Sequence, residues 1–368
     1  MSAPRFQALS VKRVSPEAAG AVAITFAIPE SDRARFTFEP GQFLTLRATI
    51  DGQDVRRTYS ISSPRSRLAR DGELEIGIRP VEGGVFSNWA AQAIKVGDAL
   101  QVMPPDGRFV VKKKRAIHRV GFAAGSGITP LLSIVASTLE EQPESKFTLI
   151  YGNRRWSTVM FNEALQDLKD RFRDRLTMIH ILSRQAQEVD LLEGRIDGDK
   201  VRQLISALLP VGSMDEVFVC GPDEMITATE AALVQAGVPA DRIYSERFTA
   251  NLPTGVTGAM CVGVASAAEA SANAAKDITM TLLLDGKEHE LAIGPDEHIL
   301  DAALNAGLDL PFSCKAGVCC TCRAKVLDGE VVMDKNFTLE ADEIEQGFVL
   351  SCQARATSKQ LRVSFDER

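Results

Sequence analysis

The sequence predicts a multidomain fold: an antiparallel β domain, a doubly wound α/β domain and a small cysteine-rich unit at the C-terminal end. Three observations predict it. Alternating apolar runs separated by turns occupy residues 1–112, a repeated strand-then-helix pattern follows, and five of the seven cysteines lie close together after residue 313. The chain of 368 residues is also longer than a single domain with one hydrophobic core usually is, and its length suits two or three domains.

The first domain, residues 1–112, is expected to be built of short strands. Apolar and polar residues alternate over 42–47 and over 73–78, and Asp51-Gly52 is a turn signal between such runs. A period of two places every second side chain on the same face of a strand. The pattern is typical of an antiparallel barrel or sandwich.

The second domain, residues 113–248, alternates strands with helices. Apolar strands are expected at 120–124, 147–151, 176–182 and 217–220, with a shorter one near 242–245. Helical patterns lie between them, and in one of these Leu131, Ile134, Val135 and Leu139 share a face. This alternation predicts a doubly wound parallel sheet.

Residues 249–276 are expected to form a flexible linker. The segment is mostly Ala, Gly, Ser and Thr, has no aromatic residue, and carries Glu269 as its only charge before Lys276. The unit that follows, residues 277–368, has 17 acidic and 9 basic residues and a net charge of -8. The other 276 residues have a net charge of +1, so the last unit is acidic on a nearly neutral body.

Composition excludes several classes of protein. A net charge of -7 leaves no basic surface for nucleic acid, and no apolar run approaches the roughly 20 residues that span a bilayer. An odd number of cysteines without a secretion signal argues against a disulfide framework. We therefore expect a cytoplasmic protein with a metal site. The histidines at 118, 180, 289 and 298 are scattered and are expected to be structural or surface residues.

The cysteines supply the strongest chemical signal. Cys314-x4-Cys319-x2-Cys322, with Cys352 thirty positions further on, is the ligand spacing of a plant-type [2Fe–2S] cluster. Structural zinc is the alternative, but zinc sites usually have two separated Cys-x2-Cys pairs. We predict the cluster. Cys320 is outside this spacing and is expected to be a small buried residue rather than a ligand.

The last unit resembles a plant-type ferredoxin. The resemblance lies in residues 311–319, Pro-Phe-Ser-Cys-Lys-Ala-Gly-Val-Cys, and in residues 350–353, Leu-Ser-Cys-Gln. The resemblance implies an α+β fold of the β-grasp type for residues 277–368.

A segment of the first domain resembles the Arg-x-Tyr-Ser motif of the ferredoxin–NADP reductase family. It is Arg57-Thr58-Tyr59-Ser60, at the end of an expected strand. The resemblance implies a FAD-binding β-barrel in which Arg57 contacts the flavin pyrophosphate, Tyr59 lies against the isoalloxazine ring and Ser60 reaches the N5 edge. The alternative is an ordinary outward strand face.

A second segment strengthens the flavin interpretation. Gly83, Gly84, Val85, Phe86 and Ser87 open an expected helix, where glycine lets a phosphate approach the free amides. The alternative is a glycine turn with a serine N-cap. Following Arg57–Ser60 at the spacing of flavin reductases, the segment implies a pyrophosphate site, and hence FAD rather than FMN.

The second domain has a glycine turn after its first strand. Gly125, Ser126 and Gly127, followed by Thr129, lead from that strand into a helix. The turn is shorter than the full dinucleotide fingerprint. Its position, at the first strand-to-helix turn of a parallel sheet, predicts that it binds a nucleotide pyrophosphate.

Further matches to the reductase family lie near the end of this domain. Cys220, Gly221 and Pro222 resemble its Cys-Gly segment, which places a thiol near the nicotinamide; the alternative for Cys220 is a buried core residue. Glu246 and Phe248 match the family's end of the nucleotide domain. The expected catalytic residues are Ser60, Cys220 and Glu246.

Ser183 and Arg184 follow the third strand and resemble the Ser-Arg pair that holds the 2′-phosphate in NADP-dependent members of the family. Arg154 and Arg155 follow the second strand and would add positive charge. These residues favour NADPH over NADH. The alternative is a set of solvated loop arginines.

The whole chain resembles the group of reductase subunits of phenylacetyl-CoA epoxidases. The resemblance implies an enzyme that passes electrons from NADPH to FAD, to the [2Fe–2S] cluster and to the oxygenase component of a multicomponent monooxygenase, here a di-iron epoxidase. From the composition, neither a nucleic acid nor a membrane is expected as a partner. Two alternatives stay open: the reductase of a Rieske-type aromatic or steroid hydroxylase, and a non-enzymatic iron–sulfur redox sensor.

Overall fold

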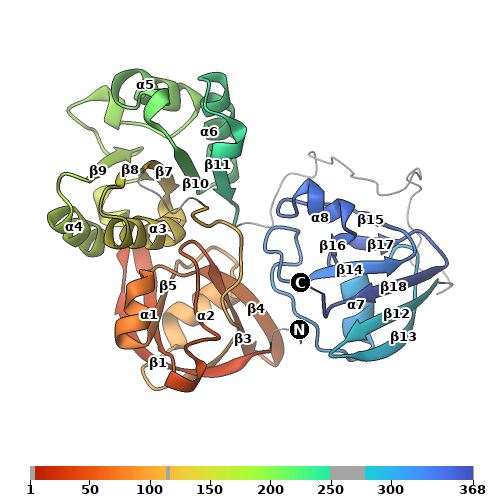
Figure 1. Ribbon diagram of the computed structural model, residues 1–368. Coiled ribbons are helices and arrows are strands. Elements are labelled where there is room, and N and C mark those ends of the chain that lie inside the picture. Colours follow the sequence, from red (N-terminus) through yellow and green to blue (C-terminus); the bar gives the residue numbers. More distant parts are fainter. Residues whose placement is uncertain (1–4, 113–116, 249–277, 368) are drawn as a thin grey trace. The chain divides into compact units, whose positions relative to one another are not determined.

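The structure is a computed structural model that describes residues 5–112, 117–248 and 278–367 (Figure 1). The chain divides into two compact units. One is Phe6–Thr249, and the other is Ala250–Arg368 together with Met1–Arg5. The linker predicted over residues 249–276 lies outside the described residues.

The first half of the larger unit is a six-stranded antiparallel sheet in the order β4-β3-β6-β1-β2-β5. A bridge between Ile61, just after β4, and Ile76 of β5 joins its two edge strands, which makes the sheet a barrel rather than a sandwich. The elements are β1 (Gln7–Pro16), β2 (Val22–Ala27), β3 (Phe43–Ile50), β4 (Gln53–Ser60), α1 (Arg65–Asp71), β5 (Glu73–Ile78), α2 (Val85–Ala93) and β6 (Ala99–Val102), with 3₁₀ turns at Ala18–Gly20 and Glu30–Asp32.

The second half of this unit is a five-stranded parallel sheet in the order β11-β10-β7-β8-β9. All five strands match the predicted ones. The elements are β7 (His118–Ala124), η3 (Gly125–Gly127), α3 (Ile128–Glu141), β8 (Lys146–Asn153), η4 (Trp156–Thr158), α4 (Asn162–Arg171), β9 (Leu176–Leu182), η5 (Asp190–Leu192), α5 (Gly198–Leu208), η6 (Val211–Ser213), β10 (Glu216–Cys220), α6 (Asp223–Gln235), η7 (Ala240–Arg242) and β11 (Ile243–Glu246).

Two hydrophobic clusters cover the two faces of the parallel sheet. The predicted face of α3 is buried in one cluster with Leu165 of α4, and Val201 of α5 and Ile226 of α6 are buried in the other. Helices α3 and α4 thus cover one face, and α5 and α6 cover the opposite face (Figure 1). This is the doubly wound arrangement, whose ligand sites lie outside the carboxyl ends of the strands.

The smaller unit is a mixed sheet in the order β13-β12-β18-β14-β16, beside a two-stranded sheet of β15 and β17. Strands β12 and β18 are parallel and the other pairs are antiparallel. The elements are β12 (Ile278–Leu284), β13 (Lys287–Ile293), α7 (Ile299–Asn305), β14 (Arg323–Asp328), β15 (Val331–Met333), α8 (Ala341–Glu345), β16 (Phe348–Leu350), β17 (Ala354–Ala356) and β18 (Gln360–Ser364).

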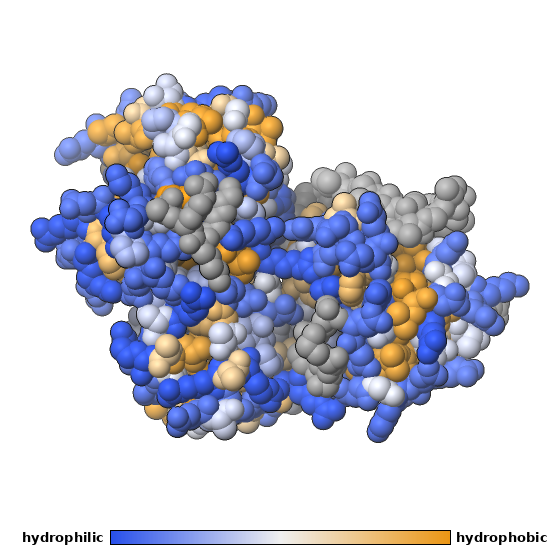
Figure 2. All heavy atoms as spheres, viewed as in Figure 1, coloured by the Kyte–Doolittle hydropathy of each residue, from blue (hydrophilic) through white to orange (hydrophobic). Residues whose placement is uncertain are grey.

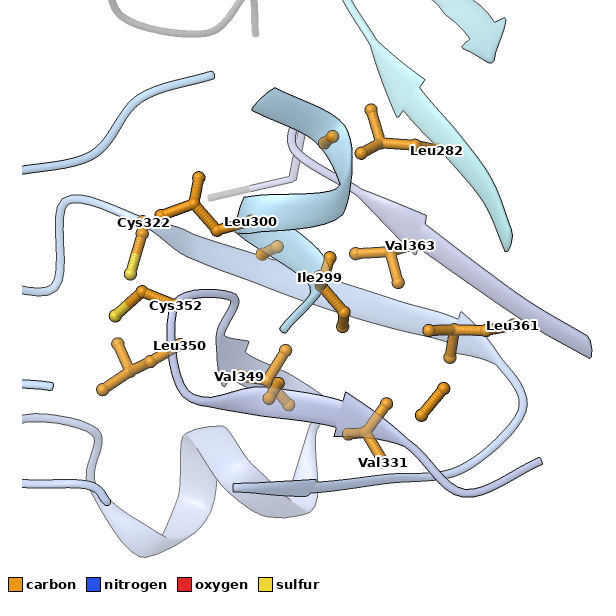
Figure 3. Packing of buried hydrophobic residues seen from close by; sticks show 14 of the residues in the cluster. Leu282, Ile299, Leu300, Cys322, Val331, Val349, Leu350, Cys352, Leu361 and Val363 are labelled. Carbon is orange, nitrogen blue, oxygen red and sulfur yellow. The ribbon is translucent and has the colours of Figure 1, made fainter. Parts of the chain in front are cut away.

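The core of this unit lies between α7 and the sheet. Figure 3 shows Ile299 of the helix facing Val363 of β18, and Leu300 of the helix beside Cys322; Leu282 and Leu361 belong to the same cluster. At one end of this core, Leu300 and Leu350 lie beside Cys322 and Cys352. Packing therefore positions two of the predicted cluster ligands.

Hydrophilic residues cover most of the molecular face that Figure 2 shows, and the hydrophobic residues there form separate patches. Among the helices that the structure describes, none has the length and apolar character needed to cross a membrane.

Candidate functional site

The three predicted catalytic residues meet where the end of β4 faces the carboxyl edge of the parallel sheet. The Ser60 hydroxyl donates a hydrogen bond of 3.1 Å to Oε2 of Glu246. Cys220 is the last residue of β10 and pairs in register with Glu246, the last residue of β11. A barrel strand and two strands of the nucleotide domain therefore bring a hydroxyl, a thiol and a carboxyl group together.

Burial sets the protonation of this group. It raises the pKa of Glu246 to about 8, although the hydrogen bond from Ser60 acts in the opposite direction. Burial, together with the nearby charge of Glu246, raises the pKa of the Cys220 thiol well above its usual range. At pH 7 both groups are therefore predominantly protonated, and the site holds a neutral carboxylic acid and a neutral thiol.

The motif Arg57–Ser60 forms the end of β4, as predicted. Arg57 and Tyr59 project from one face of the strand, and Thr58 and Ser60 from the other. The ring of Tyr59 packs on that of Phe86, with centroids 5.7 Å apart, and Phe86 packs edge-on against Trp89 at 5.4 Å. Arg57 is exposed, so its guanidinium is accessible to an anion. The aromatic side chains thus suit a flat ligand ring, and the Arg57 guanidinium suits an anionic group attached to it.

The turn at Gly83 and Gly84 leads into α2 as predicted. Gly84 is the N-cap residue and has no side chain with which to cap the helix. The Ser87 hydroxyl instead accepts a hydrogen bond of 3.3 Å from the amide of Val81, so the alternative of a serine N-cap is wrong. Gly83 has a φ of +70°, and a Cβ atom added there would meet no atom within 4 Å. Val85, the first residue of the helix, is exposed. A phosphate group would fit against this helix start.

The glycine turn of the nucleotide domain is tightly packed. A Cβ atom added at Gly127 would overlap the carbonyl oxygen of Cys220. The Thr129 hydroxyl donates to the Ser126 carbonyl at 3.0 Å, and the Tyr151 hydroxyl donates to the Gly125 carbonyl at 2.9 Å. Tyr151 is not among the predicted site residues, although it ends the second strand and begins the segment Tyr151–Arg154 that resembles the reductase group.

The segment after β10 turns directly into α6, with Pro222 as the N-cap residue. A Cβ atom at Gly221 would lie 2.8 Å from Cε of Met225 and 3.3 Å from the amide of Ala124, so the turn has little room for a side chain. Phe248 is the last described residue of this domain and is 40% exposed. Its ring is therefore accessible to a ligand.

The loops after β8 and β9 are joined by backbone hydrogen bonds. The amide of Ser183 donates to the Asn153 carbonyl and the amide of Arg184 donates to the Arg154 carbonyl, both at 2.9 Å. Arg154, Arg155 and Arg184 are exposed, and Ser183 is partly buried. Three exposed arginines thus belong to two hydrogen-bonded loops at the carboxyl edge of the sheet.

The predicted cluster cysteines form two pairs in the smaller unit. Cys314 lies beside Cys319, which lowers the pKa of the Cys314 thiol, and Cys322 lies beside Cys352, so each pair shares a proton between two sulfurs. Figure 3 shows the sulfur atoms of Cys322 and Cys352 directed toward each other. Each iron of a four-cysteine [2Fe–2S] cluster takes two cysteine sulfurs, so a two-by-two arrangement fits the cluster. Within the described ranges, no set of three or more His, Cys, Asp or Glu side chains surrounds one point as a single metal ion requires.

The loop offers backbone amides to the sulfurs. The hydrogen bond from Cys319 lowers the pKa of Cys314, and the amide of Ala316 adds a hydrogen bond of 3.3 Å to Cys314 Sγ. Gly317 has a φ of +76°, a backbone conformation that side chains rarely adopt. Cys320 is buried, as predicted, and has a φ of +59°.

Three family models match the chain in the same order as its folds. They are an oxidoreductase FAD-binding domain over residues 9–111, an oxidoreductase NAD-binding domain over 122–231 and a 2Fe–2S iron–sulfur cluster binding domain over 282–357. The fold and the site thus define an oxidoreductase that combines flavin, pyridine-nucleotide and iron–sulfur domains in one chain.

Relatives identify the family more closely. The chain is 44% identical to a subunit of the 1,2-phenylacetyl-CoA epoxidase of Escherichia coli over 99% of this chain and 98% of that protein. It is 34% identical to the ferredoxin reductase component of 3-ketosteroid-9-alpha-monooxygenase of Rhodococcus rhodochrous, over 97% of this chain and 96% of that protein. The chain belongs to this family, the reductase components of oxygenases.

A solved structure shares the fold. Phthalate dioxygenase reductase, described as a modular structure for electron transfer from pyridine nucleotides to [2Fe–2S], is similar with a TM-score of 0.57 and 22% identity. The similarity covers 98% of both chains.

Proposed function

We propose that this chain takes electrons from NADPH and delivers them through FAD and a [2Fe–2S] cluster to the di-iron oxygenase of a phenylacetyl-CoA epoxidase. The observation that carries the proposal is the 44% identity to an epoxidase component over 99% of the chain. The proposed division is a FAD domain at residues 1–112, a nucleotide domain at 113–248, a linker at 249–276 and a ferredoxin domain at 277–368.

The barrel residues are proposed to bind and orient the flavin. When bound, FAD accepts a hydride as two electrons, which leave one at a time through the cluster. Arg57 and the amides after Gly83 and Gly84 would hold the pyrophosphate, helped by Ser87, while Val85 and Phe86 shape the turn. The ring of Tyr59, supported by Phe86, would lie against the isoalloxazine, with Thr58 beside it.

Ser60, Cys220 and Glu246 are proposed to act where the hydride is transferred. The 3.1 Å hydrogen bond holds the Ser60 hydroxyl toward the carboxyl group of Glu246, which is protonated at neutral pH. A neutral acid does not repel the electron pair of an arriving hydride. Cys220 is fully buried in the core of the nucleotide domain, so it would lie beneath the nicotinamide as a neutral thiol rather than in an open site. Phe248 would lie at the edge of the same site.

The nucleotide domain is proposed to prefer NADPH. The turn of Gly125, Ser126, Gly127 and Thr129 would hold the pyrophosphate, and Gly221 and Pro222 would leave room for the nicotinamide. Ser183 and Arg184 would bind the 2′-phosphate. The exposed guanidinium groups at this edge of the sheet support the preference.

The ferredoxin domain is proposed to bind the cluster through Cys314 and Cys319 on one iron and Cys322 and Cys352 on the other. The two thiol pairs and the loop amides directed at the sulfurs support this assignment.

Reconstitution tests the proposed partner. The purified chain, NADPH and the purified epoxidase oxygenase should convert phenylacetyl-CoA to its ring epoxide, and omission of this chain should abolish the product. No product with an oxygenase that is active with its own reductase would contradict the proposal.

The 34% identity to a steroid monooxygenase reductase supports a second candidate, the reductase of a Rieske-type hydroxylase. Product formation with a steroid hydroxylase, and none with the epoxidase, would favour it. A redox sensor predicts no sustained turnover, so steady NADPH oxidation with an artificial acceptor distinguishes that class.

A further inference from the structure

The carboxyl edge of the nucleotide sheet carries a tryptophan to which the proposed function assigns no role. Trp156 opens the 3₁₀ turn after β8 and is 43% exposed. Its backbone amide donates a hydrogen bond of 3.0 Å to Oε1 of Gln185, next to Arg184. Trp156 is therefore attached to the same loop as the proposed 2′-phosphate residues.

The inner side of the Trp156 ring rests on a histidine. The ring centroids of Trp156 and His180 are 4.5 Å apart at an interplanar angle of 44°, and Tyr151 packs on His180 at 5.9 Å. Both ring nitrogens of His180 are buried, and neither has a hydrogen-bond partner among the described residues. Burial lowers the pKa of His180 to about 4, so this ring is uncharged at pH 7. His180 therefore supports Trp156 as an aromatic surface.

The turn that carries Trp156 is held in place. The amide of Arg155 donates to the Thr158 hydroxyl at 3.2 Å, and that hydroxyl donates to the Arg155 carbonyl at 2.8 Å. A flat ring on a constrained turn loses little freedom when a ligand stacks on it. One exposed arginine, Arg155, precedes Trp156 in the chain, and another, Arg184, lies in the loop that is hydrogen-bonded to this one.

We propose that the exposed part of Trp156 is the stacking surface for the adenine ring of NADPH. This inference rests on the proposed function and assigns a residue to its nucleotide site. A base has a π face and a nucleotide carries phosphate, so an aromatic ring beside guanidinium groups matches both parts of the ligand. The alternative is that Trp156 only covers His180, a role that needs apolar bulk but no exposed face. The experiment distinguishes these two roles.

Binding of nucleotide fragments to the full chain tests the proposal. Trp156→Leu keeps apolar cover over His180 but removes the flat ring, and Trp156→Phe keeps a smaller ring. We expect Trp156→Leu to weaken 2′,5′-ADP and 5′-AMP alike by about 5- to 100-fold, since both fragments contain adenine. Trp156→Phe should bind more tightly than Trp156→Leu. Val234→Ala, an exposed apolar residue of α6, is the matched control and should bind as the native chain does.

Two further measurements distinguish the stacking surface from a purely structural role of Trp156. The sequence has only two tryptophans, and the fluorescence change on adding 2′,5′-ADP should disappear in Trp156→Leu. Flavin reduction by reduced nicotinamide mononucleotide, which lacks adenine, should be unchanged in that variant. Equal fragment affinity for the native chain and Trp156→Leu would overturn the proposal, as would the absence of fragment binding to the native chain.

The outcomes also distinguish this proposal from the proposed function. If the native chain binds 5′-AMP as tightly as 2′,5′-ADP and Trp156→Leu weakens both, the stacking surface is correct and the NADPH preference is wrong. If NADPH drives electron transfer but Trp156→Leu leaves fragment binding intact, the proposed function is supported and the stacking surface is wrong.

Discussion

At the scale of single residues, the carboxyl group of Glu246 makes hydride transfer sensitive to pH. Its pKa is raised to about 8, so it is protonated below that pH and becomes a carboxylate above it. The anion would repel the arriving hydride, and we expect the rate of flavin reduction by NADPH to fall as pH rises through about 8. Glu246→Gln keeps a neutral hydrogen-bonding group and should remove this fall. Anaerobic stopped-flow measurements across neutral and alkaline pH test it, and the same alkaline fall in the variant would contradict the assignment.

A second residue-scale prediction concerns the choice of nucleotide. Arg184→Glu places a carboxylate where the 2′-phosphate is proposed to bind, and one charge-assisted hydrogen bond contributes about 1.5–3 kcal/mol. We expect kcat/KM for NADPH to fall by about 10- to 100-fold and kcat/KM for NADH to change little. Arg173→Glu, a charge reversal at a highly exposed arginine of the same domain, is the control. Equal losses with both nucleotides in Arg184→Glu would exclude a phosphate contact.

At the scale of elements, the close packing of the glycine turn against β10 positions α3. Gly127 has a φ of -61°, which alanine adopts without strain, so any effect of a methyl group there comes from its overlap with the Cys220 carbonyl. Gly127→Ala should lower the free energy of unfolding by about 1–3 kcal/mol. Gly212→Ala, where no atom lies within 4 Å of an added Cβ, should change it by about 0.5 kcal/mol or less.

Urea unfolding followed by tryptophan fluorescence measures this difference, because both tryptophans lie in the larger unit. Nucleotide binding should weaken together with stability in Gly127→Ala. Equal free energies of unfolding for the two alanine variants would show that the turn at Gly127 accommodates the methyl group without loss of stability.

At the scale of the whole molecule, the proposed flavin and cluster ligands belong to different compact units. Cys322→Ser should therefore remove the absorbance of the cluster while the chain keeps FAD. NADPH should still reduce a dye that accepts two electrons, but single-electron delivery to the oxygenase should fail. Loss of FAD in the same variant would show that the two units depend on each other for folding.

The uneven charge of the chain leads to a prediction about docking. The last unit has a net charge of -8 and the rest +1, so long-range attraction favours a partner with a basic surface. Electron transfer from the pre-reduced protein to its oxygenase should slow with added salt, because the Debye length is about 10 Å at 0.1 M. NADPH-to-flavin transfer measured in parallel controls for general salt effects, and a salt-independent rate of delivery would mean that other contacts select the partner.

Local patterns in the sequence were enough to predict the strands of the nucleotide domain, the order of the three domains and the cysteines that bind the cluster. Alternation, helical periodicity and the spacing of Cys314, Cys319 and Cys322 are properties of neighbouring residues, so they can be recognised without the fold. The resemblance of Arg57–Ser60 to a reductase motif added the flavin interpretation. Sequence patterns could not decide between a barrel and a sandwich, because that depended on the bridge between Ile61 and Ile76.

Only the tertiary structure decided how distant residues interact. Ser60 and Glu246 are 186 positions apart, and their hydrogen bond and the raised pKa exist because the end of a barrel strand meets the edge of a parallel sheet. The packing of Trp156 on His180 likewise follows from the pairing of β8 with β9, which no local pattern encodes. Periodicity and spacing report on neighbours along the chain, whereas burial and electrostatics depend on which distant segments the fold brings together.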